Sequence, residues 1–504
     1  MDNQKSFSSR WALLFAMLSM AVGTGSIWRF PRILAKNGGG TFLVPWVISL
    51  LAWSIPLIIL EFALGRGMRA GPLGSIVRLV GQKFAWMGAW ITLTAVAIMF
   101  YYSVITGWVL EYLIVSVTGQ LAKANPQQYY DQFVAGPWPL VLHVVCMSLA
   151  LLVIWRGVGA IERVTTLLLP SLFFLVVALA VRACLLPGAE RGLAFIFKVD
   201  WQQLGNYSIW LEALTQNAWD TGSGWGLITV YAIYVRQKDD SSVNCFLLGI
   251  GNNVASLLSG VAVLCTIFSI MPEAEKEIVG AGNYGLTFVW FPQLFARMPA
   301  GGLFMIVFFA ALFMAAFMSL ISMVELAVRG LQDLGMTRER SLLIAGGIGL
   351  VGGVPSALSL DFLANQDWVW ANALIPSGLM FAYVAIKYGI DEFRGRYINL
   401  ACNQMTIGRW WNFVLGVLVP VQGVVLLVWF SWQKFPAAVT ETGESVTMST
   451  RLVEWLRPDA VENVGTVLAQ WAALLMVLWA ANRWMGRNAA EHGSAAGASE
   501  QSVP

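Results

Sequence analysis

The sequence predicts an all-α polytopic membrane protein with about twelve transmembrane helices. Hydrophobic residues make up 58% of the 504 positions and charged residues only 12%, whereas soluble domains carry about a quarter of their residues as charges. Apolar runs of about twenty residues, long enough to cross a hydrocarbon core of roughly 30 Å, recur along nearly the whole chain. Glycine-rich interruptions in two of these runs predict broken helices, which a membrane tolerates only where they line a cavity.

The apolar runs place the expected spans along the chain. We expect them at residues 12–34, 41–64, 87–118, 138–155, 164–187, 209–235, 244–271, 302–328, 341–359, 368–388, 410–432 and 462–485. They form two groups of five, 12–187 and 209–388, followed by two further helices over 410–485. Residues 1–11 are expected to be a cytoplasmic N-terminal segment, and the Ala-, Gly- and Ser-rich residues 486–504 a disordered cytoplasmic tail.

Basic residues gather in the loops that follow the even-numbered spans, and short cytoplasmic loops keep an excess of Lys and Arg. The residues concerned are Arg66, Arg69, Arg78, Lys83, Arg156, Arg163, Arg236, Lys238, Arg338, Arg340, Lys387, Arg394, Arg396 and Arg409. No small-residue cleavage motif precedes Gly23, so the first span is expected to be retained. The sequence therefore predicts a multi-pass protein of the cell inner membrane with both termini in the cytoplasm.

Several classes of protein are excluded by motifs that the chain lacks. Its five cysteines and two histidines show no metal-ligand spacing, so neither structural zinc nor a disulfide framework is expected. A net charge of +3 gives a nucleic-acid partner no electrostatic support. Neither G-x-x-x-x-G-K-[ST] nor H-E-x-x-H occurs, and we expect no enzyme. Uphill transport would therefore draw on an ion gradient or on a separate subunit.

The first and the sixth spans contain the glycine-rich interruptions. They read SMAVGTGS over residues 19–26 and WDTGSGWG over residues 219–226. Being five spans apart, they suit two inverted repeats of five helices, whose unwound halves expose amides to an anion and carbonyls to a cation. Close helix packing explains the glycines of the first span equally well. Asp220 favours an ion site, because a carboxylate at mid-helix costs about 2.5 to 3.5 kcal/mol unless something offsets it.

Longer motifs identify a family. Residues 25–31 (GSIWRFP), 36–45 (KNGGGTFLVP) and 61–66 (EFALGR), with YAIYV at 231–235, resemble the neurotransmitter:sodium symporters, in particular their bacterial amino-acid transporters. The resemblance covers the first ten spans and, weakly, the last two. It implies the leucine-transporter fold, with a 5+5 inverted repeat and broken helices 1 and 6. It also implies sodium-coupled import of an amino acid or related zwitterion by alternating access, performed by a monomer or homodimer in the lipid bilayer.

The resemblance implies a substrate site at the two interruptions. The corresponding positions are Met20, Ala21, Gly23, Gly25, Ile98, Tyr102, Trp219, Gly222, Trp225, Ser319 and Met323. The backbone around Gly23 and Gly25, with the Tyr102 hydroxyl, matches the place of the substrate carboxylate. Monoamine carriers have an aspartate at the position of Gly23, so glycine favours a substrate that brings its own carboxylate. Ordinary apolar packing explains Ile98 and Met323 equally well.

Two sodium sites are implied, and both depart from the family pattern. The first corresponds to Ala21, Ser26, Asp220 and Asn252, and the second to Ser19, Val22, Ala315 and Ser319. Asp220 stands where the family has a threonine, and its carboxylate can replace what the shorter Ser26 does not reach. At the second site a thioether, Met318, stands where the family has a hydroxyl. One sodium ion, two ions with water filling the gap, and proton coupling through Asp220 all stay open.

The chain is expected to work without chloride. The fixed carboxylate of Asp220 supplies the negative charge that chloride supplies in chloride-dependent relatives. Trp46 stands where a tyrosine helps to hold chloride, and an indole has a single donor and no acceptor. Gln216 and Ser256 keep the polar character of a chloride site, so uptake that vanishes in gluconate would refute this expectation.

Charged residues match the family's gates. Arg29 and Asp367 correspond to the outer pair, which closes over the substrate, and Trp219 to an aromatic lid beneath them. Glu61 is a second acid within a span; we prefer a carboxylate that accepts bonds from the broken backbone of the sixth span over a proton relay.

On the inner side, Asp333 with Lys5 or Arg10 corresponds to the gate pair. Beside the symporter, a proton-coupled carrier and a non-transporting amino-acid sensor of the same fold remain alternatives. A sensor would bind its ligand without accumulating it under any gradient.

Overall fold

The computed structural model describes residues 6–121, 125–236, 239–438 and 446–500, which contain helices and no strand. The first helices are α1 (Arg10–Ala21), α2 (Phe30–Lys36), α3 (Gly40–Ser49), α4 (Ile55–Met68), α5 (Pro72–Val80), α6 (Ala85–Val117), α7 (Pro126–Ala135), α8 (Trp138–Trp155), α9 (Val158–Cys184), α10 (Ala189–Phe197), α11 (Tyr207–Asp220) and α12 (Leu227–Ala232). The later ones are α13 (Ser241–Ile270), α14 (Glu275–Gly280), α15 (Gly282–Tyr284), α16 (Phe291–Ala296), α17 (Gly301–Asp333), α18 (Arg338–Gly352), α19 (Val354–Leu358), α20 (Leu360–Asn372), α21 (Leu374–Tyr388), α22 (Ile390–Phe393), α23 (Trp410–Phe413), α24 (Val419–Gln433), α25 (Met448–Trp455) and α26 (Val464–Glu500). Short π-helical segments are η1 (Gly25–Arg29), η2 (Leu50–Ser54), η6 (Gly285–Trp290), η7 (Arg394–Ile398) and η8 (Val414–Leu418). Short 3₁₀ helices are η3 (Gln82–Phe84), η4 (Gln203–Gly205) and η5 (Pro272–Ala274).

Within the described residues, ten helical segments are long and apolar enough to cross a membrane, and α1 with α2 forms an eleventh that is bent by 59°. The pair α11 and α12 lies where the sixth span is expected. At about 1.5 Å per residue neither of its helices, of 14 and 6 residues, crosses a bilayer alone. These segments coincide with the expected spans, which confirms the all-α polytopic fold with broken helices 1 and 6.

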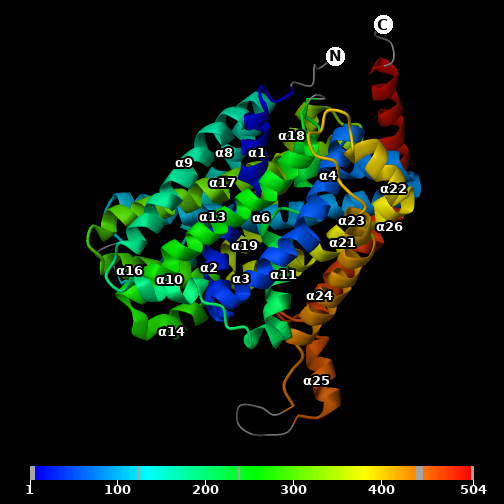
Figure 1. The fold of residues 1–504 in the computed structure, drawn as a ribbon. Coiled ribbons are helices and arrows are strands. Elements are labelled where there is room, and N and C mark those ends of the chain that lie inside the picture. The colour runs from blue at the N-terminus through cyan, green and yellow to red at the C-terminus, as the bar shows by residue number, and fades with distance from the viewer. Residues whose placement is uncertain (1–5, 122–124, 237–238, 439–445, 501–504) are drawn as a thin grey trace.

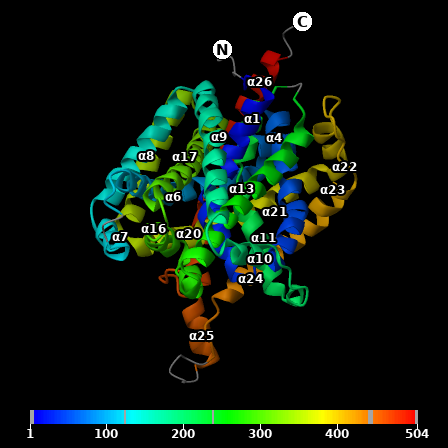
Figure 2. The same cartoon turned by 60° about the vertical axis from the view of Figure 1, so that its left-hand side comes forward.

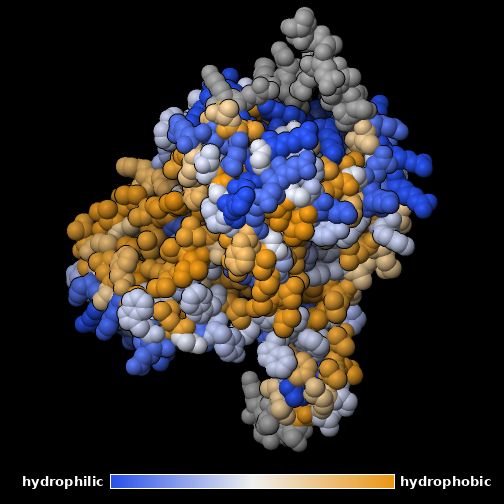
Figure 3. Space-filling view, turned by 45° about the vertical axis from the view of Figure 1, so that its right-hand side comes forward, coloured by the Kyte–Doolittle hydropathy of each residue, from blue (hydrophilic) through white to orange (hydrophobic). Residues whose placement is uncertain are grey.

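Both chain termini lie at one end of the molecule, here named the terminal end, and α25 lies at the opposite or far end (Figures 1 and 2). A chain that crosses the membrane an even number of times begins and ends on the same side. Elements that carry the basic loops, such as α18 and α22, are also at the terminal end (Figure 1). Figure 3 shows hydrophilic side chains gathered there above a broad apolar belt.

The outer helices expose side chains that a soluble protein would bury. Phe174 on α9 is 72% exposed, Leu343 on α18 is 78% exposed and Trp479 on α26 is 79% exposed. Lipid tails are as apolar as these side chains, so such exposure costs little in a bilayer. The central helices α6 and α17 are mostly buried and position the site described below.

The C-terminal tail is more ordered than the sequence predicts. α26 continues to Glu500, so residues 486–500, expected to lack order, form a helix. Alanine recurs in this stretch and has the highest helix propensity, and the side chains of Met485 and Ala489 are buried against the bundle. Lys5 and Lys238 lie outside the described residues.

Candidate functional site

The first span is interrupted at residues 22–24, here named the first break. The Gly23 N–H bonds to Ala21 O at 2.8 Å, whereas an unbroken helix would give it to Ser19 O. The Thr24 N–H instead donates to Tyr102 Oη at 3.3 Å, across from α6. The segment beyond the break opens with N–H groups that have no helical acceptor. The predicted carboxylate position therefore combines free amides with the Tyr102 hydroxyl.

The second break covers residues 221–226, between α11 and α12. Gly222, Gly224 and Gly226 all have φ between 72° and 85°, a conformation that side chains with a Cβ rarely adopt. The Gly224 N–H donates to Glu61 Oε1 at 2.6 Å, and the Thr229 hydroxyl donates to Glu61 Oε2 at 3.5 Å. Glu61 thus accepts bonds from the interrupted backbone, as the preferred interpretation of this residue predicts.

Asp220, the last residue of α11, lies where the two breaks meet. The hydroxyls of Ser26 and Ser256 donate to its two carboxylate oxygens at 2.8 Å each, and Asn252 Nδ2 donates at 3.3 Å. A Cβ on Gly25 would lie 2.9 Å from Asp220 Oδ1, so only glycine allows this approach. The side chain is 5% exposed and joins no ion pair within the described ranges.

These groups fit a small hard cation. Carboxylate, hydroxyl and amide oxygens are the ligands that such ions prefer, and the structure brings those of Asp220, Ser26 and Asn252 together. One turn earlier on α11, the buried side-chain amide of Gln216 lies close to this carboxylate. Burying the Asp220 carboxylate costs free energy because no basic side chain in the described structure pairs with it. A bound cation would offset that cost.

The residues expected at the second sodium site lie between the first break and α17. Ser319 Oγ donates to Met20 O at 3.3 Å, and Ala315 is fully buried one turn away. Val22 is the first residue of the break and Ser19 lies in the last turn of α1, where its hydroxyl donates to Ala16 O at 2.8 Å. The four predicted residues are therefore neighbours, but they form no set of converging side-chain oxygens.

A cavity of about 500 Å³ lies over the breaks, within the range of about 300 to 1,000 Å³ that ligand pockets span. Every predicted substrate position lines it, namely Met20, Ala21, Gly23, Gly25, Ile98, Tyr102, Trp219, Gly222, Trp225, Ser319 and Met323. Sequence reasoning missed other lining residues, namely Thr24, Arg32, Glu212, Thr215, Asn283, Phe430, Lys434 and Glu462. Phe430 on α24, Lys434 directly after α24 and Glu462 before α26 belong to no motif, so only the fold reveals their contribution.

The cavity opens toward the far end. Lys434 and Glu462, which form an ion pair at 2.6 Å next to the ends of α24 and α26, belong to its wall. The terminal end is closed. Phe7 is 1% exposed there and donates its N–H to Tyr234 O at 3.2 Å, and Arg236 Nη1 donates to Ser8 O at 2.9 Å. A solute in the cavity would therefore reach water only on the side away from the termini.

The expected outer gate is not paired. Arg29 and Asp367 both line the cavity, but no ion pair joins them in the part of the chain that the structure describes. The Arg29 guanidinium instead lies 3.5 Å from the centre of the Trp219 ring, and Trp219 stacks on Phe430 with ring centres 5.5 Å apart. The aromatic face competes for the cation while the cavity is open.

Of the expected inner pair, the structure describes Asp333 and Arg10, whereas Lys5 lies outside the described residues. Asp333 accepts the N–H groups of Gly71 at 3.0 Å and Gly74 at 2.9 Å, at the start of α5, and lies 3.9 Å from Arg329 Nε. Arg10 Nε donates to Asn244 Oδ1 instead. A helix N-terminus carries partial positive charge, so the start of α5 stabilises the Asp333 carboxylate.

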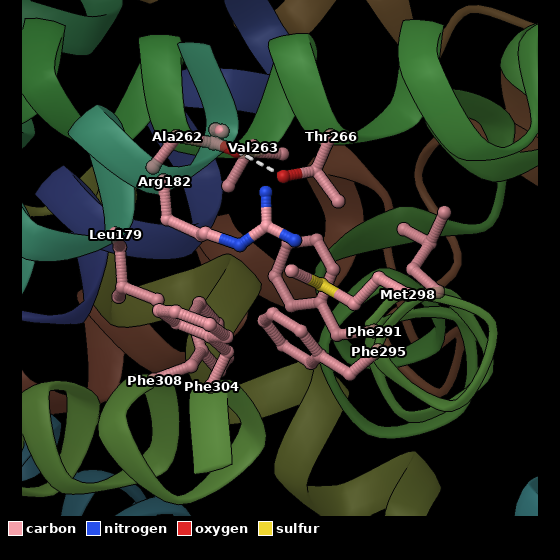
Figure 4. Close-up of a pocket in the computed structure, with 12 residues that line it drawn as sticks. Leu179, Arg182, Ala262, Val263, Thr266, Phe291, Phe295, Met298, Phe304 and Phe308 are labelled. Carbon is pink, nitrogen blue, oxygen red and sulfur yellow. Dashed lines mark hydrogen bonds between the residues drawn. The ribbon is translucent and has the colours of Figure 1, made fainter. Parts of the chain in front are cut away.

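Two other cavities do not fit a zwitterion. One, of about 20 Å³, surrounds the Arg182 guanidinium among phenyl rings near Thr266 (Figure 4). It holds about one water, which needs about 10 to 15 Å³. The other, of about 330 Å³, is lined by apolar residues such as Leu93, Phe100 and Ile348 with almost no polar group, and a buried charge without a polar partner is costly.

Comparison with known proteins agrees with this geometry. An uncharacterised sodium-dependent transporter of Methanocaldococcus jannaschii is 30% identical over 439 residues, which cover 83% of this chain and 88% of that protein. An uncharacterised sodium-dependent transporter of Bacillus subtilis is 27% identical over 450 residues, covering 85% and 98%. The crystal structure of MhsT in complex with L-phenylalanine matches with a TM-score of 0.74 and 26% identity, over 84% of this chain and 99% of MhsT.

The sequence profile of the sodium:neurotransmitter symporter family matches residues 4–133 and 131–485, nearly the whole chain. With the relatives above, this match confirms the family resemblance and excludes an enzyme. The chain belongs to the sodium:neurotransmitter symporter family, as a multi-pass membrane transporter with a small-molecule substrate.

Proposed function

We propose that this protein is a sodium-coupled symporter that imports an amino acid or a related zwitterion by alternating access. The observation that carries the proposal is the meeting of both breaks at Asp220, in the wall of a single cavity. Unwound backbone there offers amides for an anion and carbonyls for a cation. A zwitterion needs both.

The site favours a substrate that brings its own carboxylate. A Cβ on Gly23 would lie 2.9 Å from Ser319 Oγ and 3.1 Å from Tyr102 Oη, so a larger side chain at this position would displace both hydroxyls. The space beside them is left to a carboxylate of the substrate, with the amides of η1 as donors. MhsT, whose structure holds L-phenylalanine, supports an amino acid. Met20, Ile98 and Met323 would then contact an apolar side chain.

Sodium would be held by Asp220, Ser26, Asn252 and the Ala21 carbonyl. When bound there, it supplies a positive charge beside the substrate's carboxylate. The chain's own contribution is to fix Asp220 through three donors and to exclude water by burial.

Chloride independence is part of the proposal. Asp220 already carries a fixed negative charge, and the buried Trp46 Nε1 has no hydrogen bond partner in the described structure. An indole offers one donor where a hydroxyl could donate and accept.

The cavity and the basic loops together support an orientation. With the terminal end in the cytoplasm of the cell inner membrane, the open cavity faces outward and the packed end around Phe7 and Asp333 closes the inside. Closure over a substrate would bring Arg29 and Asp367 together and let Trp219 cover the site. Opening to the cytoplasm would release Asp333 from α5.

Thermal stabilisation of the purified protein by each of the twenty amino acids, in sodium, potassium or lithium, tests substrate class and coupling together. We expect stabilisation that requires both an amino acid and sodium. Uptake into proteoliposomes then separates transport from sensing, because a sensor would bind without accumulation. A protein that responds to neither amino acids nor sodium would refute the proposal.

Proton coupling is the second candidate, and the buried carboxylate of Asp220 favours it. A proton-coupled carrier would accumulate substrate on an inward pH gradient without sodium. The sodium symporter would not.

A further inference from the structure

The first break has a second flank, which faces α17 instead of α11. The Ser19 carbonyl is released from the helical ladder because its usual donor, the Gly23 N–H, bonds to Ala21 O at 2.8 Å. The neighbouring Met20 carbonyl accepts a hydrogen bond from Ser319 Oγ. A cation on this flank would need further oxygens from α17 to complete its shell.

The side of α17 that meets the break has few oxygens that could bind an ion. Ala315, Met318, Ser319 and Ser322 recur at helical spacing on one side, and all are buried. Ser322 Oγ is engaged by Tyr231 Oη at 2.8 Å and by the Met318 carbonyl at 3.0 Å. Of these four side chains, only that of Ser319 turns an oxygen to the break.

Met318 brings a thioether where a second hydroxyl would be needed. Thioethers are soft ligands, whereas hard cations such as sodium prefer oxygen. The second sodium site that the family implies therefore does not fit the residues present. By contrast, the opposite flank offers the carboxylate of Asp220 and the side-chain oxygens of Ser26 and Asn252.

We infer that this transporter couples each turnover to one sodium ion, bound at Asp220, and that Met318 removes the second site. The inference rests on the proposed function. In place of an ion, the Ser319–Met20 hydrogen bond joins α1 to α17, and the Met318 side chain is fully buried. Uptake then depends on the first power of the sodium concentration, whereas two sites would give the second power.

Accumulation in proteoliposomes measures this stoichiometry. With the membrane potential held at zero by potassium and valinomycin, a tenfold sodium gradient is worth about 1.4 kcal/mol per coupled ion. We expect the wild-type protein to accumulate its substrate about tenfold, whereas two ions would give about 100-fold. Accumulation near 100-fold overturns the inference alone. Uptake that ignores sodium overturns the proposed function, and the stoichiometry with it.

A gain-of-function variant sharpens the test. Met318→Thr restores a hydroxyl, so we expect accumulation to rise to about 100-fold and the sodium Hill coefficient from about 1 to about 2. Met318→Leu, of similar size but without oxygen, should stay at the wild-type values. Substrate-dependent thermal stabilisation checks that each variant folds. A folded M318T variant that still accumulates tenfold contradicts the role assigned to Met318, and if M318T does not fold, the wild-type ratio decides.

Discussion

The two flanks of the first break are buried alike but built differently. Toward α11 and α13, the Asp220 carboxylate is surrounded by donors from Ser26, Asn252 and Ser256. Toward α17, the hydroxyl of Ser319 donates to the Met20 carbonyl, and no carboxylate lies beside it. A buried carboxylate is costly without a counter-charge, whereas a flank that holds no carboxylate needs none. The difference teaches that one side of the break is incomplete without a cation and the other is not.

The largest effect is expected from Asp220→Asn, which removes the charge from the polar flank. We expect the sodium concentration for half-maximal uptake to rise by about 100-fold or more, equivalent to about 2.7 kcal/mol. Glu212→Gln is the matched control, because Glu212 lines the same cavity eight residues earlier on α11, about 12 Å away. If D220N and E212Q depend on sodium equally, Asp220 is not the residue that distinguishes the two flanks.

A smaller loss is expected when the approach of Asp220 is blocked by bulk. In Gly25→Ala the added Cβ would lie 2.9 Å from Asp220 Oδ1, and overpacking of this kind costs about 1 to 3 kcal/mol. We expect sodium half-saturation to rise by about 20-fold. Gly347→Ala on α18, where nothing lies within 4 Å of the new Cβ, should leave it unchanged. If both variants behave like wild type, Gly25 does not set the ion site.

Ser256→Ala should weaken the same flank more mildly. It removes one donor to Asp220 Oδ2, worth about 1 kcal/mol and thus about fivefold in sodium half-saturation. Ser259→Ala is the control on the same helix, because Ser259 bonds only to the backbone of α13 in the described structure. Sodium titrations of substrate-dependent thermal stability compare the two, and a larger effect in S259A would contradict the assignment.

The smallest effect is expected from replacing chloride by gluconate. Because the carboxylate of Asp220 already lies beside the proposed ion position, uptake should change by less than about twofold. Radiolabelled uptake at constant sodium measures this. Complete loss of uptake would show that the polar flank needs a second anion.

The fold and the position of the site were predictable from local sequence. Spans follow from apolar length, and breaks follow from glycines that a lipid-facing helix would not tolerate. Asp220, Ser26 and Asn252 lie on three separate helical segments. Their positions in the family pattern predict that they meet at one site. Gly222 and Gly25 mark the same place through their conformation and lack of a Cβ.

Other features depend on tertiary packing and on the state of the transporter. Phe430 and Lys434 reach the cavity only because α24 packs beside α11, and no motif announces this. The contacts of the expected gate residues also depend on this state. Arg29 lies on Trp219 while the cavity is open, and Asp333 finds the start of α5 while the terminal end is closed. The sequence identifies the charged residues, but which groups they contact depends on the conformation of the transporter.

Equilibrium binding of ²²Na⁺ to the purified protein tests the central claim most directly, since it involves no flux, gradient or orientation. We expect about one sodium ion per wild-type molecule, with binding retained in E212Q and lost in D220N. Binding by D220N with the affinity and stoichiometry of the wild type would contradict the account, because the two breaks would then meet at a carboxylate that holds no ion.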